Sequence, residues 1–164
     1  CRIQEKHKQV IELVINLSSF LIEHNTKIHI FGDGPDFQQL FAFIKKNHLS
    51  NNVFLYRWTS RSDIFKNYDF SAVISNSKFE GLPLASLESI GNFKLLISRN
   101  SPGNFEITDK NFLYNDYDEL IQILIFYMNI DDSSLHKLIV SHKNHIKRTY
   151  SKSKLLLSLT NLFK

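Results

Sequence analysis

The chain has 164 residues, of which 43% are hydrophobic and 22% are charged, as in one globular domain that buries a core. These values exclude collagen-like, low-complexity and disordered chains, and no apolar run approaches the roughly 18 residues that a membrane-spanning helix needs. The single cysteine, Cys1, cannot form an internal disulfide. The composition is therefore typical of a protein from a reducing compartment.

The net charge of +4 is unevenly distributed. Residues 133–164 contain seven Lys and Arg and no Asp or Glu, so this segment carries +7 and residues 1–132 carry −3. The basic charge falls on one predicted helical segment rather than on a surface with interleaved aromatic residues, which argues against nucleic-acid binding. Its apolar residues could instead lie on an anionic membrane surface; they are Leu155, Leu156, Leu159, Leu162 and Phe163.

Hydrophobic periodicity predicts helices that alternate with short apolar strands. A helix is expected over residues 5–23, where Val10, Val14, Leu17 and Leu21, with Ile11 and Ile15 beside them, recur at helical spacing. Strands are expected at 27–31, 53–56, 71–74 and 94–98. A second helix is expected from Pro35, with Phe37, Leu40, Phe41 and Ile44 on one face, and a short one from Ser60 or Ser62. A fourth helix is expected from Leu82 to Ile90, with Gly91 as its C-cap. The last two are expected over Leu120–Met128 and over 133–164, the latter with a possible break near Thr149–Ser151.

This alternation predicts an α/β fold, a Rossmann-like doubly wound parallel sheet with helices on both faces. Ligands of such folds bind at the carboxyl ends of the strands. In this chain those ends are followed by four loops, at 32–35, 56–59, 75–81 and 98–106. We therefore expect any ligand site to be built from these loops.

The third of these loops leads directly into a helix and contains several groups that could bind a ligand. The amides of Gly81, Leu82 and Leu84 would be free at the helix start, and Pro83 has no amide to lose. Free amides and the positive end of the helix dipole form an anion site that suits a diphosphate.

Two carboxylates flank this anion site. Glu80 lies just before the predicted helix and Glu88 lies about two turns further along. Carboxylates accept paired hydrogen bonds from vicinal hydroxyls, so a diphosphate site between two glutamates predicts a nucleotide sugar as ligand. The alternative is structural, because Glu80 could be a first-turn helix carboxylate and Glu88 a solvated or paired helix residue.

With these motifs the chain resembles the C-terminal, donor-binding domain of the retaining, GT-B-fold glycosyltransferases of family 4. The resemblance covers nearly the whole chain and rests on Ile30–Pro35, Val53–Phe54, Asp69–Ser75, the E-x7-E pair Glu80 and Glu88, and Ser101–Glu106. It implies that residues 1–164 are a nucleotide-sugar-binding domain, one half of a GT-B fold. It also implies that the acceptor-binding N-terminal domain, and the first strand of the present domain, are not included.

The resemblance assigns roles to individual residues. Glu80 corresponds to the residue that holds a donor-sugar hydroxyl and Glu88 to the ribose ligand, while the amides of residues 81–84 correspond to those that hold sugar and phosphates. Gly32 and Glu106 correspond to further donor-site positions, and a base could pack near Tyr56. Arg2 matches the first member of a basic pair that neutralises the leaving diphosphate.

Three positions depart from the family pattern. The lysine of the basic pair is displaced by one position either way, so Lys6 and Lys8 both qualify; we favour Lys8. Cys1 stands where the family has Gly, and Ser101-Pro-Gly-Asn replaces a Gly-Gly pair. Arg2 and Lys8 could also be no more than a charged helix start.

The resemblance implies a retaining hexosyltransferase that transfers sugar from a nucleotide diphosphate sugar, with UDP favoured, to a glycan or lipid-linked acceptor. It suggests bacterial surface polysaccharide or lipopolysaccharide synthesis in the cytoplasm, at the inner face of the membrane. No metal or other cofactor is expected, since His136, His142 and His145 lack a companion carboxylate or thiolate. A non-catalytic nucleotide-binding or interaction module of the same fold is the alternative.

Overall fold

The computed structural model describes residues 2–81 and 83–150. The predicted alternation of helices and strands is confirmed. In chain order the elements are α1 (Glu5–Lys8), α2 (Val10–Glu23), β1 (Ile28–Phe31), α3 (Phe37–Lys46), η1 (Leu49–Asn51), β2 (Val53–Tyr56), α4 (Arg61–Asn67), β3 (Ala72–Ser75), α5 (Leu84–Gly91), β4 (Leu95–Arg99), η2 (Lys110–Phe112), β5 (Leu113–Tyr114), α6 (Tyr117–Asn129) and α7 (Asp132–Thr149). The apolar tail residues from Leu155 onward, and Leu82, lie outside the described residues.

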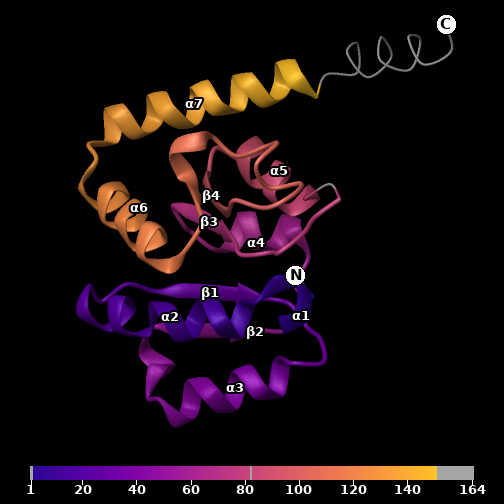
Figure 1. Cartoon of the computed structure of the whole chain (residues 1–164), viewed down its shortest axis with the longest axis vertical. Helices are drawn as coiled ribbons and strands as arrows, with labels where there is room; N and C mark the ends of the chain where they lie inside the picture. Colours follow the sequence, from indigo (N-terminus) through magenta and orange to yellow (C-terminus); the bar gives the residue numbers. More distant parts are fainter. Residues whose placement is uncertain (1, 82, 151–164) are drawn as a thin grey trace, which may run out of the picture.

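The strands are parallel, as predicted, but they form two sheets. β1 pairs with β2, and β4 lies between β3 and β5. Figure 1 shows β1 and β3 as the edges of the two sheets that face each other. On the edge of β1 that faces β3, the described residues show a single parallel bridge, between Arg2 and Asp33. Asp33 lies two residues past the end of β1. Within the described residues, β1 and β3 are therefore not hydrogen-bonded to each other.

The predicted first helix is present but divides at Gln9, which has a left-handed backbone with φ of 47°. The carboxylate of Glu5 explains the break, because it accepts hydrogen bonds from the amides of Ile11 and Glu12, both at 2.8 Å, and so caps α2. The end of α1 turns toward the loop after β3, where the amide of Lys78 donates to the carbonyl of His7 at 2.9 Å.

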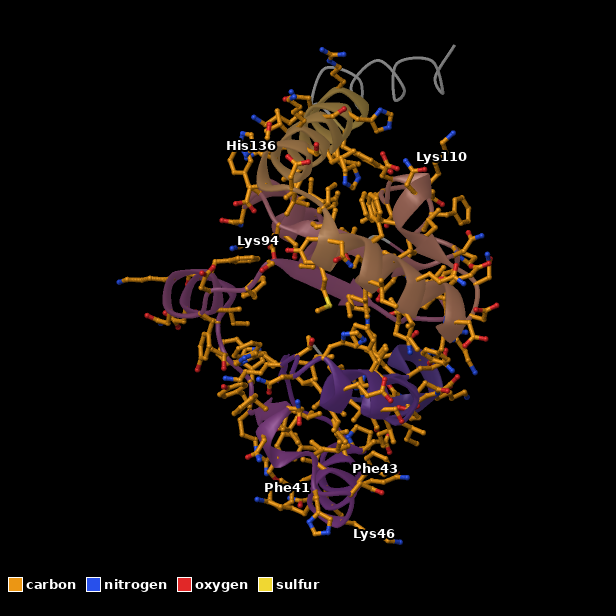
Figure 2. All side chains as sticks on the ribbon, turned by 90° about the vertical axis from the view of Figure 1, so that its left-hand side faces the viewer. Phe41, Phe43, Lys46, Lys94, Lys110 and His136 are labelled. Carbon is orange, nitrogen blue, oxygen red and sulfur yellow. The ribbon has the colours of Figure 1, made fainter. Side chains whose placement is uncertain are left out.

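The predicted apolar faces are confirmed in part. The core includes Val10, Val14, Leu17 and Leu21 of α2, Leu40 and Ile44 of α3, and Leu120 of α6. Ile15, Phe41 and Met128 are 45–49% exposed instead, and Figure 2 shows Phe41 at the outer side of α3. These helices bury narrower stripes than their apolar content suggests, because only one face of each meets a sheet or another helix.

α5 begins at Leu84, two residues later than predicted, with Pro83 as its N-cap. The carbonyl of Pro83 accepts hydrogen bonds from the amides of Ser86 and Leu87 at 3.0 and 3.1 Å. The prediction of Gly91 as C-cap is wrong, because Gly91 is the last helical residue and Asn92 is the cap. The amide side chain of Asn92 donates to the carbonyl of Glu88 at 2.8 Å, which satisfies the helix end without a glycine.

α7 is anchored beside α5 by two side chains. The buried imidazole of His142 lies 2.7 Å, through Nε2, from the carbonyl oxygen of Ile107. Lys143 donates to the carbonyl of Gly91 at 2.6 Å and lies 3.1 Å from the ring centroid of Phe93. The helix therefore holds the loop after β4 and the end of α5 together.

We expect the free energy of unfolding to fall in acid, because burial lowers the pKa of His142 below its ordinary value of 6.5. Between these two values the unfolded chain binds a proton that the folded chain does not, so stability is lost as the pH falls from about 6.5 through the folded pKa. Urea unfolding at about pH 7.5 and about pH 5.5 measures the loss, and His142→Gln should reduce it. An equal loss in the variant would contradict the assignment.

Candidate functional site

The four predicted loops are connected to one another at the carboxyl edge of the strands. The guanidinium of Arg57, after β2, donates to both carboxylate oxygens of Asp33, after β1, at 2.9 and 3.0 Å. The amide of Glu80, after β3, donates to the carbonyl of Pro102, after β4, at 3.0 Å. The N-terminal segment joins the two pairs, because the amide of Ile3 donates to the carbonyl of Asp33 at 2.8 Å and α1 reaches the loop after β3.

Lys8 and Glu80 form an ion pair at the centre of this edge. The two side chains are 29% and 17% exposed, respectively, so the pair is partly shielded from water. Lys6 is exposed, and no ion pair of it is found within residues 2–81 and 83–150. Of the two lysines that the sequence leaves open, the structure brings Lys8 to the predicted sugar-binding carboxylate.

Backbone contacts fix the position of Lys8. The buried side chain of Asn76 donates to the carbonyl of Gln9 at 2.7 Å, next to the bond between Lys78 and His7. Asn76 also receives hydrogen bonds from the hydroxyl of Tyr114 at 2.7 Å and from Nε of Arg99 at 3.3 Å. The sequence analysis missed Asn76, although an Asn directly after an apolar strand, in a loop expected to bind ligand, is a signal that could have found it.

Arg2 and Gly32 lie on the side of β1. Arg2 is exposed beside Asp33, and Gly32 is buried, with its amide donating to the carbonyl of Tyr56 at 3.1 Å. The hydrogen bond from the amide of Gly34, and then the one from Arg57, lower the pKa of Asp33. A Cβ at Gly34 would lie 2.8 Å from the carbonyl carbon of Ile3. The absence of a side chain at Gly34 therefore permits the N-terminal segment to approach the loop after β1.

The start of α5 is open to solvent. Gly81 is exposed, Leu84 is 53% exposed and Pro83 is buried. The first hydrogen bonds of the helix are donated by Ser86 and Leu87, so the amides of Leu84 and Ala85 precede the intrahelical ladder and can meet an anion. Glu80 lies four residues before this start.

Glu88 lies in the second turn of α5, at a groove of about 410 Å³ between α4 and α5. Ser62, Phe65 and Lys66 form the α4 side of the groove, and Glu88 and Asn92 form the α5 side. The groove combines an aromatic ring, a cation, a carboxylate and an amide, which are the groups that a nucleoside can use. The sequence analysis predicts the helix that contains Phe65 and Lys66 but does not include these two residues among the site candidates.

Tyr56 is placed differently from the expectation. Its ring stacks on Phe31 with centroids 4.6 Å apart, and its hydroxyl lies 3.2 Å from Nδ1 of His29. Burial is the main cause that raises the pKa of Tyr56. Tyr56 lines a smaller pocket of about 190 Å³ beside α3 and is not among the residues that line the groove at Glu88.

Glu106 is exposed, and its carbonyl accepts a hydrogen bond from the hydroxyl of Tyr150, just past α7, at 3.4 Å.

His136 is exposed on α7 (Figure 2) and His142 is buried. Across residues 2–81 and 83–150, no group of three or more His, Cys, Asp or Glu could hold a metal ion. In the same part of the chain, no helix is both long and apolar enough to cross a bilayer.

Among known protein families, the glycosyl transferases group 1 match this chain over residues 2–139. Similar proteins include the lipopolysaccharide 1,6-galactosyltransferase of Escherichia coli K12, 32% identical over 92 residues, which are 52% of this chain and 24% of that protein. The poly(glycerol-phosphate) alpha-glucosyltransferase of Bacillus subtilis 168 is 38% identical over 69 residues, 40% of this chain and 10% of that protein. The chain thus spans a quarter or less of the length of these two relatives.

Solved structures agree in fold. Staphylococcus aureus TarM, in a complex that contains UDP, matches 99% of this chain and 34% of its own with a TM-score of 0.85 at 22% identity. Anabaena HepE in complex with UDP matches 99% of this chain and 46% of its own with a TM-score of 0.76 at 16% identity.

Proposed function

The chain belongs to the group 1 glycosyl transferases, and on that basis we propose that it is the donor-binding half of a retaining enzyme of GT family 4. The donor is a nucleotide diphosphate sugar, with UDP as the favoured nucleotide. Support for UDP comes from the complexes of TarM and HepE with it. The second half of the active site, which binds the acceptor, belongs to the N-terminal domain of the intact enzyme.

The observation that carries the proposal is the Lys8–Glu80 pair in front of the open start of α5, with Glu88 further along the same helix at the groove. In the proposed complex the diphosphate contacts Lys8, Arg2 and the first amides of α5. Glu88 accepts hydrogen bonds from the ribose hydroxyls, and Glu80 accepts one from a hydroxyl of the donor sugar. Gly32 and Glu106 border the site, and the base lies in the groove beside Phe65.

The chemistry follows from the charges. When the bond between the sugar carbon and the diphosphate oxygen breaks, its electron pair stays on the diphosphate, and Lys8, Arg2 and the helix start stabilise that charge. The acceptor hydroxyl attacks the same face of the sugar that the nucleotide leaves, and its proton passes to the departing diphosphate. The new glycosidic bond therefore keeps the configuration of the donor, and no metal ion is required.

The proposed acceptor is a glycan or lipid-linked glycan of a bacterial surface polysaccharide or lipopolysaccharide, assembled at the cytoplasmic face of the membrane. Support for this choice comes from two relatives, a lipopolysaccharide 1,6-galactosyltransferase and a poly(glycerol-phosphate) alpha-glucosyltransferase. A peripheral contact with the membrane, through the basic C-terminal segment, would bring the site to such an acceptor.

Product analysis of the intact enzyme tests the function. Incubation with a UDP-sugar and a lipopolysaccharide or polyol-phosphate acceptor should give UDP and a glycoside with the donor's anomeric configuration, as read by NMR. The rate should be the same with and without EDTA, because the protein's own cations face the diphosphate. An inverted product would contradict retention, and UDP binding without any transfer would favour a non-catalytic module.

A further inference from the structure

The loop after β4 touches the backbone of Glu80. Gly103 has φ of 84°, a left-handed conformation, and a Cβ at this position would lie 2.7 Å from the carbonyl carbon and 2.8 Å from the Cβ of Glu80. The neighbouring Pro102 accepts the hydrogen bond from the amide of Glu80. The carbonyl oxygen of Glu80 also lies in the way, and both it and the carbonyl carbon belong to the main chain. A rotamer change alone therefore cannot make room for a side chain.

We propose that Gly103 is a positioning residue that sets the place of Glu80, and through Glu80 the rate of sugar transfer. The inference rests on the proposed function, because it uses Glu80 as the carboxylate that holds the donor sugar. Gly103 touches no reacting group itself, and its contribution is to let two loops meet without a gap.

Buried hydrogen bonds keep the two loops in contact. The hydroxyl of Ser101 donates to the carbonyl of Ser77 at 2.7 Å, and the side chain of Asn104 donates to the same carbonyl at 3.3 Å. The side chain of Asn104 also bonds to Ser101 at 3.1 Å. Ser101, Ser77 and Asn104 are at most 6% exposed, so water cannot easily replace these bonds. The loop after β4 therefore cannot retreat from an added methyl group without breaking them.

The opposite side of the Glu80 loop is also held. The amide of Lys78 is bonded to α1, and Lys8 of α1 is paired with the carboxylate of Glu80. A Cβ at position 103 must displace either the main chain of Glu80 or the loop after β4. The nucleotide groove is lined by α4 and α5 and includes neither Gly103 nor its neighbours. Lys8, which contacts the diphosphate in the proposed complex, keeps its place through the hydrogen bond from Asn76 to the carbonyl of the adjacent Gln9. The effect should therefore fall on the sugar more than on the nucleotide.

Gly103→Ala in the intact enzyme tests the proposal, with Gly91→Ala as the matched control, because a Cβ at Gly91 meets nothing within 4 Å. We expect kcat for transfer to fall about 100-fold in Gly103→Ala, since a displacement of about 1 Å costs that much. The Kd for UDP, measured by calorimetry, should stay within about threefold of the unsubstituted value. Gly91→Ala should match the unsubstituted enzyme in both measurements.

Two further variants distinguish the displacement of Glu80 from two other causes of lost transfer, strain in the backbone of residue 103 and misfolding. Gly103→Asn tolerates a left-handed backbone but still adds a Cβ, so it should lose transfer as Gly103→Ala does. Ser101→Ala adds no bulk and removes one bond to Ser77, and should lower kcat by less, about tenfold, again with UDP binding retained.

Three results would overturn the inference: full transfer by Gly103→Ala, full transfer by Gly103→Asn, or equal losses of UDP binding and kcat in Ser101→Ala. Absence of transfer in the unsubstituted enzyme would instead contradict the proposed function, so the two failures are distinct.

Discussion

Glu80→Ala is expected to reduce sugar transfer by the intact enzyme about 1,000-fold while leaving the fold intact. The carboxylate supplies a charged hydrogen bond to the donor sugar, and truncation also leaves Lys8 without its partner at the centre of the edge. Loss of one aligned polar group of this kind typically costs 10²–10³ in kcat, roughly 3–4 kcal/mol of transition-state stabilisation. Initial-rate kinetics with saturating UDP-sugar measure the effect.

Glu23→Ala is the matched control, because Glu23 is an exposed glutamate at the end of α2, before the start of β1 and not in any of the loops at the carboxyl ends of the strands. It should transfer at the unsubstituted rate. Circular dichroism and thermal unfolding of both variants separate a lost contact from a lost fold. Turnover of Glu80→Ala at the unsubstituted rate would remove Glu80 from the site.

Lys8→Ala is expected to weaken UDP binding about 100-fold, whereas Lys6→Ala should change it less than about twofold. Lys8 is held at the loop before α5 by the bonds around His7 and Gln9, and a partly shielded cation contributes about 1.5–3 kcal/mol to binding a diphosphate. Lys6 is exposed and would interact with the ligand only through water, where screening is strong.

Calorimetric titration of the two lysine variants with UDP distinguishes these residues, which are two positions apart and chemically identical. Equal losses would mean that general positive charge, and not a placed cation, attracts the diphosphate. A larger loss in Lys6→Ala would reverse the assignment and move the phosphate site away from Glu80.

Local patterns in the sequence predict most of the fold. The spacing of Val10, Val14, Leu17 and Leu21 identifies α2 and its buried face, and each apolar run becomes a parallel strand. The break at Gln9 could not be predicted in the same way, because it depends on the carboxylate of Glu5 capping α2, and helical periodicity continues through it. The separation of β1 from β3 depends on strand pairing, which is a long-range property.

The same distinction between local patterns and long-range contacts applies to the candidate site. Glu80 and Glu88 stand in one loop and one helix, so their eight-residue spacing in the sequence was enough to find them. Gly103 and Asn104 act through contacts between loops that are about 25 residues apart in sequence, and a single sequence carries no signal for such pairs. For Tyr56 the sequence leaves two interpretations open, a contact with the base of the ligand or a structural aromatic residue, and in the structure its ring packs on Phe31.

The central claim is that the carboxyl edge binds the nucleotide part of a sugar donor. Calorimetric titration of the intact protein with UDP, beside Glu88→Ala, tests it most directly. We expect saturable binding of one UDP per chain, with the affinity reduced at least about tenfold in the folded variant. The reason is that a carboxylate that accepts hydrogen bonds from the ribose contributes more than about 1.4 kcal/mol to binding. No binding of UDP, or identical binding by the unsubstituted protein and Glu88→Ala, would contradict it.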